Sequence, residues 1–310
     1  MLKKYKIITI LILFTLILGG CNWMSEVSPS NQNDNGEKDT NSNDVYVPVQ
    51  EYTGGEEYTL ANGKETGRIA NEKREEVEKA IQSFFKEDYK TDVKVHNIVG
   101  NVDGATVFVE SIGEPHFYTY AIIPIDRKQE IIMTDSIWTQ EMVVEDAIIT
   151  GLYGLAYKSE FNKLDKILEE ISIQFNLTGK TIEAIKNSGG AGFSTNFYFV
   201  QVADNDPFKS IIDKYLQNPN IKPEQWNTIF SNSNIKPEAL LISIKMYMSN
   251  NDEPNKKAFE KLVSVVEKSD DIPSGAYSII LNNNEVNKTN GISESNNSLE
   301  QSYPQDIIKD

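Results

Sequence analysis

The sequence predicts an α+β protein: an N-terminal helix packed on an antiparallel β-meander, followed by a mainly helical C-terminal half. A helical apolar stripe between residues 68 and 88 precedes three runs rich in β-branched and aromatic residues, at 92–100, 105–111 and 116–126. Helical periodicity then dominates residues 141–175 and 206–268, with a last strand expected at 277–281. Grouped helices and strands are typical of α+β folds, and the cystatin-like arrangement is the fold analogy for the first half.

The first twenty residues have the layout of a secretory signal. A basic start precedes an apolar stretch over residues 7–18, shorter than the roughly 20 apolar residues that a membrane-spanning helix needs. The stretch LILGGC, residues 16–21, then places small residues before Cys21, the only cysteine. This order resembles the lipobox of bacterial lipoproteins, and the resemblance implies cleavage before Cys21 and a diacylglyceryl group with palmitate-type chains on it. The alternatives are an ordinary cleaved signal with a stray thiol, or a catalytic cysteine.

Residues 21–50 are predicted to form a disordered linker. The stretch 22–44 is rich in Asn, Asp and Ser and has too few aliphatic side chains to bury a core. A reactive cysteine needs a structured pocket, so Cys21 is interpreted as an anchor, and two acyl chains give stable membrane attachment. The same polar composition returns at 282–310, where a disordered tail is predicted.

Charge narrows the choice of partners. The sequence has 46 acidic and 30 basic residues, a formal net charge of −16. Nucleic acid and anionic lipid repel such a surface, so no nucleic-acid partner is expected. The predicted partners are the lipid bilayer, through acylated Cys21, and an envelope protein or glycan. The predicted location is the extracytoplasmic face of the cell membrane.

The ordered body divides into an α+β domain at 51–204 and a mainly helical region at 205–281. In the first domain, turn residues at 101–104 and 112–115 join the strands of the meander. Strict alternation places Val93, Val95 and Val99 on one face, which the helix would cover.

His96 and His116, the only histidines, lie on or beside neighbouring predicted strands. A paired metal site is geometrically possible, but zinc prefers three or four ligands and neither a further histidine nor a free cysteine exists to complete the set. The competing interpretation is structural, with His96 half-exposed on its strand and His116 held in a turn. No metal site is predicted, and whether the two side chains are close is left open.

Tyr118 and Tyr120 belong to an aromatic-rich stretch that could form a platform for a glycan or a peptide. Alternating aromatic residues in strands more often serve core and cross-strand packing. His96, His116, Tyr118 and Tyr120 are therefore retained as speculative binding residues, without a catalytic role.

Other motifs do not identify a catalytic centre or a cofactor. Gly179, Lys180 and Thr181 resemble the end of a P-loop, but Gln174 stands where the first glycine of that motif is required. The glycine-rich stretch 188–192 lacks the strand before it and the helix after it that a dinucleotide loop needs. No cofactor is predicted, and enzymatic activity is not favoured.

The block at residues 77–126, together with GLYGLAYKSEF at 151–161 and ISIKMYM at 242–248, resembles a family of Gram-positive lipoproteins known as domain of unknown function 1672. The resemblance covers nearly the whole mature chain. It implies a location and a domain extent, and brings no catalytic residue, cofactor or substrate.

The function predicted from these observations is binding or interaction at the cell envelope by a membrane-anchored lipoprotein. One alternative is a solute-binding lipoprotein of a transporter, which should show a deep pocket between two lobes. The other is a cell-wall hydrolase, which should show two convergent carboxylates, one of them with a raised pKa.

Overall fold

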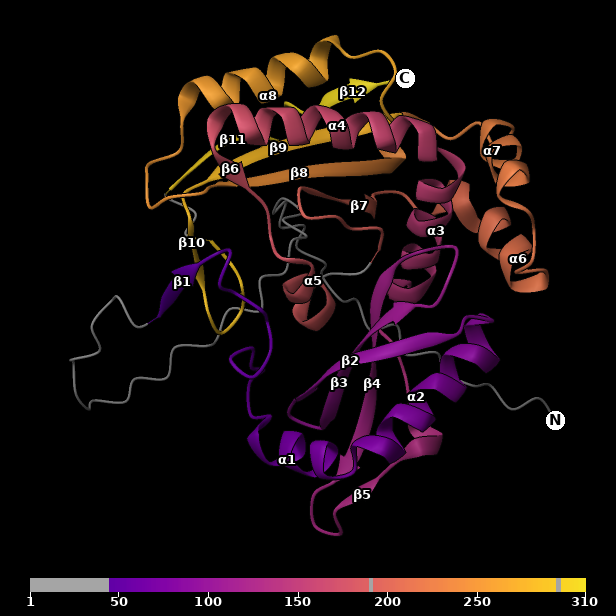
Figure 1. Cartoon of the computed structure of the whole chain (residues 1–310). Helices are drawn as coiled ribbons and strands as arrows, with labels where there is room; N and C mark the ends of the chain where they lie inside the picture. Colours follow the sequence, from indigo (N-terminus) through magenta and orange to yellow (C-terminus); the bar gives the residue numbers. More distant parts are fainter. Residues whose placement is uncertain (1–44, 190–191, 294–296) are drawn as a thin grey trace, which may run out of the picture. The chain divides into compact units, whose positions relative to one another are not determined.

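A computed structural model describes residues 45–189, 192–293 and 297–310. The predicted signal peptide, Cys21 and most of the predicted linker lie outside the described residues. Within the described ranges, no helix has the length and apolar character needed to cross a membrane. The chain is an α+β protein, as predicted, built from helices and mainly antiparallel sheets (Figure 1).

The first sheet is an antiparallel meander with two helices on one face. Its elements are α1 (Lys64–Glu72), α2 (Arg74–Tyr89), β2 (Val93–Gly100), β3 (Gly104–Ser111), β4 (Tyr118–Asp126) and β5 (Ile131–Ile132), with the strands in the order β2-β3-β4-β5. Val107 on β3 and Ala121 on β4 pair in register and are fully buried. The stripe Val77, Ile81 and Phe85 of α2 is buried in the same core, as expected for an amphipathic helix.

Three glycines let α1 contact the sheet backbone to backbone. A Cβ atom on Gly100, the last residue of β2, would lie 1.9 Å from the carbonyl oxygen of Gly63 and 2.2 Å from the backbone nitrogen of Gly67. Thr66, in the same helical turn, donates a hydrogen bond of 2.7 Å to the carbonyl oxygen of Asn101, just beyond β2. The helix start is therefore fixed against the end of one strand.

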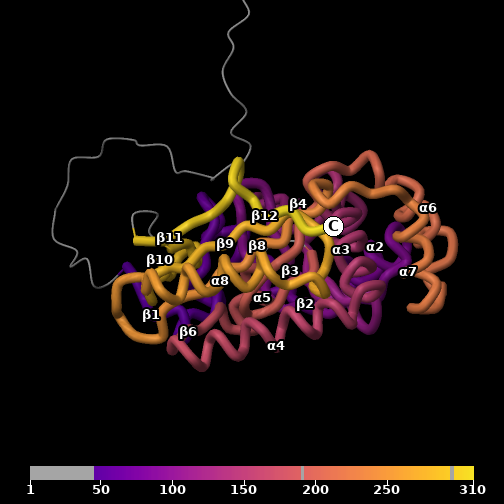
Figure 2. Tube along the Cα trace, turned by 90° about the horizontal axis from the view of Figure 1, so that it is seen from above, coloured from indigo at the N-terminus to yellow at the C-terminus, as the bar shows by residue number. Residues whose placement is uncertain are grey.

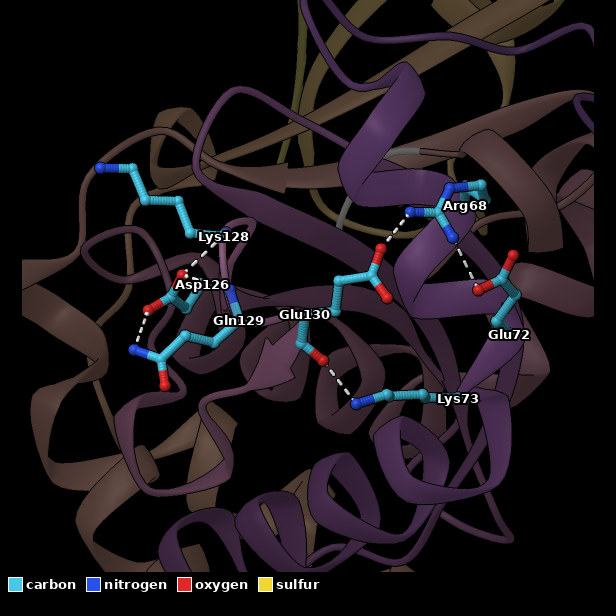
Figure 3. A network of polar contacts seen from close by, with 7 residues as sticks. All are labelled: Arg68, Glu72, Lys73, Asp126, Lys128, Gln129 and Glu130. Atoms are coloured by element: carbon cyan, nitrogen blue, oxygen red, sulfur yellow. Dashed lines mark hydrogen bonds and ion pairs between the residues drawn. The ribbon is translucent and has the colours of Figure 1, made fainter.

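An exposed polar network joins α1 to the turn between β4 and β5 (Figure 3). Arg68 forms ion pairs with Glu72 at 2.7 Å and with Glu130 at 2.5 Å, and Lys73 donates to the Glu130 carbonyl oxygen. The carboxylate of Asp126 accepts the backbone N–H groups of the two residues that follow Arg127 in the turn. These contacts position the turn relative to α1. Because the ion pairs are exposed to water, they contribute little to the stability of the protein.

The second sheet is mixed. Its strands are β6 (Leu177–Thr178), β7 (Tyr198–Val202), β8 (Leu240–Met248), β9 (Gly275–Asn282), β11 (Ser298–Gln301) and β12 (Ile307–Lys309). The central strands β8 and β9 are parallel, and α8 (Lys256–Lys268) forms the crossover that a parallel pair requires. The outer edge of β9 pairs with β11 along one half and with β12 along the other.

Helices cover one face of this sheet and fill the space beside it. Helix α4 (Lys158–Phe175) lies beside α8 on that face (Figure 2). Helix α3 (Val143–Ala156) contacts β4 of the first sheet and β7 of the second, and is buried around most of its circumference. Helices α6 (Lys209–Gln217) and α7 (Pro223–Ser231) pack on α3.

The short helix α5 (Ile182–Ser188) links the two sheets (Figure 1). It contacts β2 and β3 of the first sheet, while its Ala184 joins a small apolar cluster with Tyr247 of β8. The hydroxyl of Thr181 caps the helix by accepting the Ala184 backbone N–H at 3.0 Å. Strands β1 (Tyr46–Pro48) and β10 (Glu285–Asn287) pair and complete this cluster.

The C-terminal part differs from the sequence-based expectation. Segment 282–310, predicted to be disordered, contains β10, β11 and β12. Edge strands need few apolar side chains, so their composition resembles that of a tail. Region 205–281, predicted to be mainly helical, contains β8 and β9, because a short apolar run such as ISIKMYM does not distinguish a buried strand from a buried helix. The proposed boundary at 204 falls between β7 and β8, which are paired neighbours in one sheet.

Candidate functional site

A β-bulge on β2 presents His96 on the face of the first sheet opposite α1 and α2. The residues on either side of His96 pair with consecutive residues of β3, so His96 is an extra residue in the ladder. Beyond the bulge the alternation is reversed, and Ile98 joins Val93 and Val95 in the core. The prediction that Val99 shares their face is wrong, because alternation assumes an uninterrupted register.

Glu110 on β3 brings the two histidines together. Its Oε2 lies 2.8 Å from Nε2 of His96, and its Oε1 lies 3.0 Å from Nε2 of His116. The ammonium of Lys186, from α5, lies 3.2 Å from Oε2. An ionised carboxylate only accepts hydrogen bonds, so both imidazoles carry a proton on Nε2. These four residues are called the Glu110 cluster below.

The turn that carries His116 is held by Ser111, the last residue of β3. The Ser111 hydroxyl donates to the carbonyl oxygen of Pro115 at 2.8 Å and accepts the backbone N–H of Phe117 at 2.9 Å. Helix α3 lies directly behind, since a Cβ atom on Gly151 would be 2.9 Å from the His116 carbonyl oxygen. The turn is thus restrained on both sides, which fixes the direction of the His116 ring.

Lys186 is placed by the hydrogen bonds that hold α5. Asn97, the residue after the bulge, donates at 3.1 Å to the carbonyl oxygens of both Gly54 and Asn187. Asn187 in turn donates to the carbonyl oxygen of Thr53 at 3.0 Å. One amide therefore connects β2, α5 and the chain segment that follows β1.

The carboxylate of the Glu110 cluster is ionised at neutral pH. Burial acts to raise the pKa of Glu110, but the hydrogen bonds from His116, His96 and Lys186 outweigh it and lower that pKa to about 2. Burial lowers the pKa of His96, although the hydrogen bond to Glu110 opposes the shift. At neutral pH the cluster therefore contains an ionised Glu110 and a neutral His96.

A cleft of about 830 Å³ opens beside the cluster. His96 and Asn97 belong to its wall, which is otherwise formed by α1, the end of β2 and residues 55–62. Arg74 also lines it, donating to the His96 carbonyl oxygen at 3.1 Å and pairing with Glu78 at 2.7 Å. The cleft lining therefore includes basic, amide and imidazole groups, together with the acidic residue Glu56.

The two predicted tyrosines lie on one face of β4, and one of them contacts the Glu110 cluster. Tyr118 pairs with Glu110 across the strands, and its ring lies edge-on to His116 with centroids 5.1 Å apart. Burial, followed by the negative charge of Glu110, raises the pKa of Tyr118 to about 12, so the phenol stays protonated. Tyr120, two residues further along the same face, packs on Phe108 and donates to Gln140 at 2.6 Å. Tyr118 is only 4% exposed and lies beneath the surface.

A family model described as "Protein of unknown function (DUF1672)" matches residues 39–309. The chain belongs to the DUF1672 family. It is similar to the crystal structure of a DUF1672 family protein from Staphylococcus aureus subsp. aureus Mu50, with 17% sequence identity and a TM-score of 0.68 over 86% of this chain and 98% of that chain. At this identity the likeness shows the fold alone. No curated protein matches the chain.

In this DUF1672 protein, residues 45–189, 192–293 and 297–310 contain no group of three or more His, Cys, Asp or Glu side chains arranged to hold a metal ion. The Nε2 atoms of His96 and His116 are directed at the Glu110 oxygens instead.

A raised carboxyl pKa, which a hydrolase would need, occurs at Asp146 on α3, at Asp165 on α4 and at Asp306, and burial is the main cause at each. Burial, followed by the charge of Glu145, raises the pKa of Asp146 to about 6. The two residues are adjacent on a helix, however, and adjacent helical positions point in different directions. They do not form a convergent pair.

Two members of the Glu110 cluster, Glu110 itself and Lys186, are not among the site residues predicted from the sequence. Glu110 has a weak signal: it is the acidic residue in a valine-rich strand, on the face opposite the inward valines. Lys186 has no such signal in the sequence, because its contact with Glu110 depends on the tertiary packing of α5 between the two sheets.

Proposed function

We propose that this DUF1672 protein is a lipid-anchored binding module on the extracytoplasmic face of the cell membrane. The LILGGC stretch supports the anchor on Cys21, and the acidic composition argues against a nucleic-acid partner. The partner would be an envelope protein or a glycan, bound at the Glu110 cluster and the adjoining cleft.

One observation carries the assignment of the binding surface: His96 belongs both to the Glu110 cluster and to the wall of the cleft. The carboxylate fixes the imidazole proton on Nε2 and leaves Nδ1 as an acceptor. His116 and Lys186 are 35% and 31% exposed, so a partner can reach them. A charged group held by several partners at the edge of a cleft is a common feature of functional sites.

The cleft lining indicates polar recognition. It contains amide side chains and one aromatic ring, which hydrogen-bond and stack with sugar rings and peptide groups alike. These residues are Tyr58, Asn62, Asn71, Asn97 and Asn187.

The binding proposal is tested by a thermal-shift screen of the native protein in detergent against cell-wall glycan fragments and short peptides, because a ligand that binds the native state raises Tm. Glu110→Gln should weaken any hit at least tenfold. The matched control is Glu114→Gln, whose exposed carboxylate makes a long ion pair of 3.7 Å with Lys158. A hit that Glu110→Gln leaves unchanged would place the binding surface elsewhere.

The anchor is tested separately. Cys21→Ser should abolish incorporation of labelled palmitate and release the protein from the membrane fraction into the medium. Retention of the Cys21→Ser protein on the membrane, without shedding, would refute the lipid anchor while leaving the binding surface untouched.

We also infer that the first half follows the cystatin-like arrangement, with α2 lying across the β2-β3-β4 meander. The packing of the buried stripe of α2 against β2 and β4 supports this comparison. It concerns architecture alone and carries no inhibitory function with it.

A further inference from the structure

A second, smaller pocket lies on the face of the second sheet that α4 and α8 do not cover. Its volume is about 250 Å³. Lys245 of β8 lines it, and Lys245 alternates along the strand with Ile244 and Met246, which lie in the core. Phe199 and Gln201 of β7 line the same pocket. The pocket is separate from the Glu110 cluster.

The backbone around the pocket is held by a double link. Lys180 donates its backbone N–H to the carbonyl oxygen of Asn196 at 3.1 Å, and the Asn196 side chain donates to the carbonyl oxygen of Lys180 at 2.8 Å. Lys245 donates its backbone N–H to the carbonyl oxygen of Phe197 at 2.8 Å. A Cβ atom on Gly179 would lie 2.0 Å from the Asn196 carbonyl oxygen. Both lysines are therefore anchored to one segment.

The positive charge of Lys245 acts on Lys180, and no Asp or Glu is among the described residues that line the pocket. Each lysine carries a positive charge in the pocket, and among the residues that the structure describes neither forms an ion pair. The negative charge that acts on Lys245 comes from Glu300 of β11, beyond ion-pair distance. The pocket is thus electropositive within an acidic protein.

Burial of two lysine side chains that have no ion-pair partner within the described ranges is energetically unfavourable. Burial, followed by the charge of Lys245, lowers the pKa of Lys180 to about 8, and burial lowers the pKa of Lys245 as well. An apolar side chain at either position would avoid the desolvation of a charge. A bound anion would satisfy both lysines and remove the penalty.

We propose that the pocket formed by Lys180, Lys245, Phe197 and Phe199 binds a small organic carboxylate. The two ammonium groups would hold the carboxylate oxygens, and the phenyl rings would contact the apolar body of the ligand. The side chains of Asn196 and Gln201 supply further hydrogen-bonding groups. The volume lies below the roughly 300 to 1,000 Å³ that drug-sized ligands occupy, which limits the ligand to a small molecule.

The test uses the full-length native protein in detergent, with benzoate as the probe and benzyl alcohol as its uncharged analogue. Benzoate should raise Tm with a saturable concentration dependence, and benzyl alcohol at equal concentration should not. Phenyl phosphate distinguishes carboxylate selectivity from general anion binding. Sodium chloride at matched ionic strength controls for screening. Absence of a benzoate-specific shift overturns the proposal, as does an equal shift with chloride.

Variants locate the site. Lys180→Met and Lys245→Met should each weaken benzoate binding at least tenfold, while Lys180→Met raises the Tm of the ligand-free protein because it removes a desolvated charge. Lys261→Met, at an exposed position of α8, should leave binding unchanged. Glu110→Gln should also bind benzoate normally, which separates this inference from the proposed function. Unchanged affinity in Lys180→Met would overturn the proposal.

A second measurement does not depend on thermal unfolding. Reductive methylation of the native protein, followed by mass spectrometry, reports the accessibility and protonation of each lysine. Saturating benzoate should slow modification of Lys180 and Lys245 and leave Lys261 unaffected. If Lys180 and Lys245 were modified at the same rates with and without benzoate, the assignment of the binding site would be contradicted.

Discussion

His96 Nε2 lies 2.8 Å from Glu110 Oε2, although strict strand alternation would not bring the two residues opposite each other. Glu110 is paired with Lys94, and His96, the bulge residue two positions further along β2, reaches the carboxylate diagonally across the strands. Bulges are frequent next to functional sites because they redirect one side chain without breaking the sheet. The relationship has measurable consequences for stability and for titration.

Replacing Glu110 with Gln should destabilise the protein by about 1 to 2 kcal/mol at pH 7, after allowance for partial solvent screening. The pKa of the Glu110 carboxyl falls from 4.5 to about 2 on folding. The hydrogen bonds to the ionised carboxylate therefore contribute fully to the free energy of unfolding above pH 4.5, and this contribution is lost as the pH falls towards 2. Denaturant unfolding of both proteins should therefore show a difference at pH 7 that narrows below pH 4.5. A difference that is constant with pH would show that the carboxylate charge is not responsible.

The titration of His96 should respond in opposite directions to two substitutions. Glu110→Gln removes a negative charge and should lower the pKa of His96 further, whereas Lys186→Met removes a positive charge and should raise it. Nuclear magnetic resonance of the imidazole resonances across pH measures both shifts. Shifts of the same sign in the two variants would contradict the assigned electrostatics.

Gly100→Ala should cost about 2 to 3 kcal/mol of unfolding free energy, because the new methyl group would meet the backbone of α1. Gly55→Ala is the matched control: its Cβ atom would lie 3.3 Å from the hydroxyl oxygen of Thr53, a side-chain atom that can move. We expect this control to stay within about 0.5 kcal/mol of the parent protein. Chemical denaturation distinguishes the two variants, and equal stabilities would show that α1 can shift away from β2.

Removal of residues 298–310 should expose the edge of β9 and cause association, since an unpaired apolar edge is a template for another strand. The deletion also removes Lys309, whose ammonium donates to the Glu267 carbonyl oxygen of α8 at 3.1 Å. Light scattering and thermal unfolding should show larger particles and a lower Tm. Deletion of Asp310 alone, beyond β12, should change neither. A monomeric truncated protein with the parent Tm would contradict the structural role of β11 and β12.

The sequence predicts the first half of the fold better than the second for a physical reason. Helix α2 and strands β2 to β4 are local neighbours, and the periodicity of α2 is visible because one face of the helix is exposed to solvent. Strands β8 and β9 are apolar over most of their length, so alternation disappears, whereas β11 and β12 are short and lie in a polar stretch of sequence. These strands are defined by pairing partners distant in the chain.

The candidate site was partly predictable. The sequence predicts His96 and His116 as site residues because they are the only two histidines. It predicts Tyr118 because this residue lies two positions after His116 in an aromatic-rich stretch. Their common partner Glu110 could not be selected from 46 acidic residues without the register of the hairpin. The bulge at His96 has no glycine or proline to signal it, and Lys186 arrives from a helix that contacts the sheet only through tertiary packing.

In the part of the chain that the structure describes, the outer edge of β9 pairs only with strands that follow it. While the chain folds, a β9 strand that has paired with β8 alone presents an open edge until β11 and β12 join it. Incompletely folded chains with unpaired edges are prone to association. Closure of the second sheet therefore waits for residues 298–310, and an exported chain can complete it only after those residues have crossed the membrane.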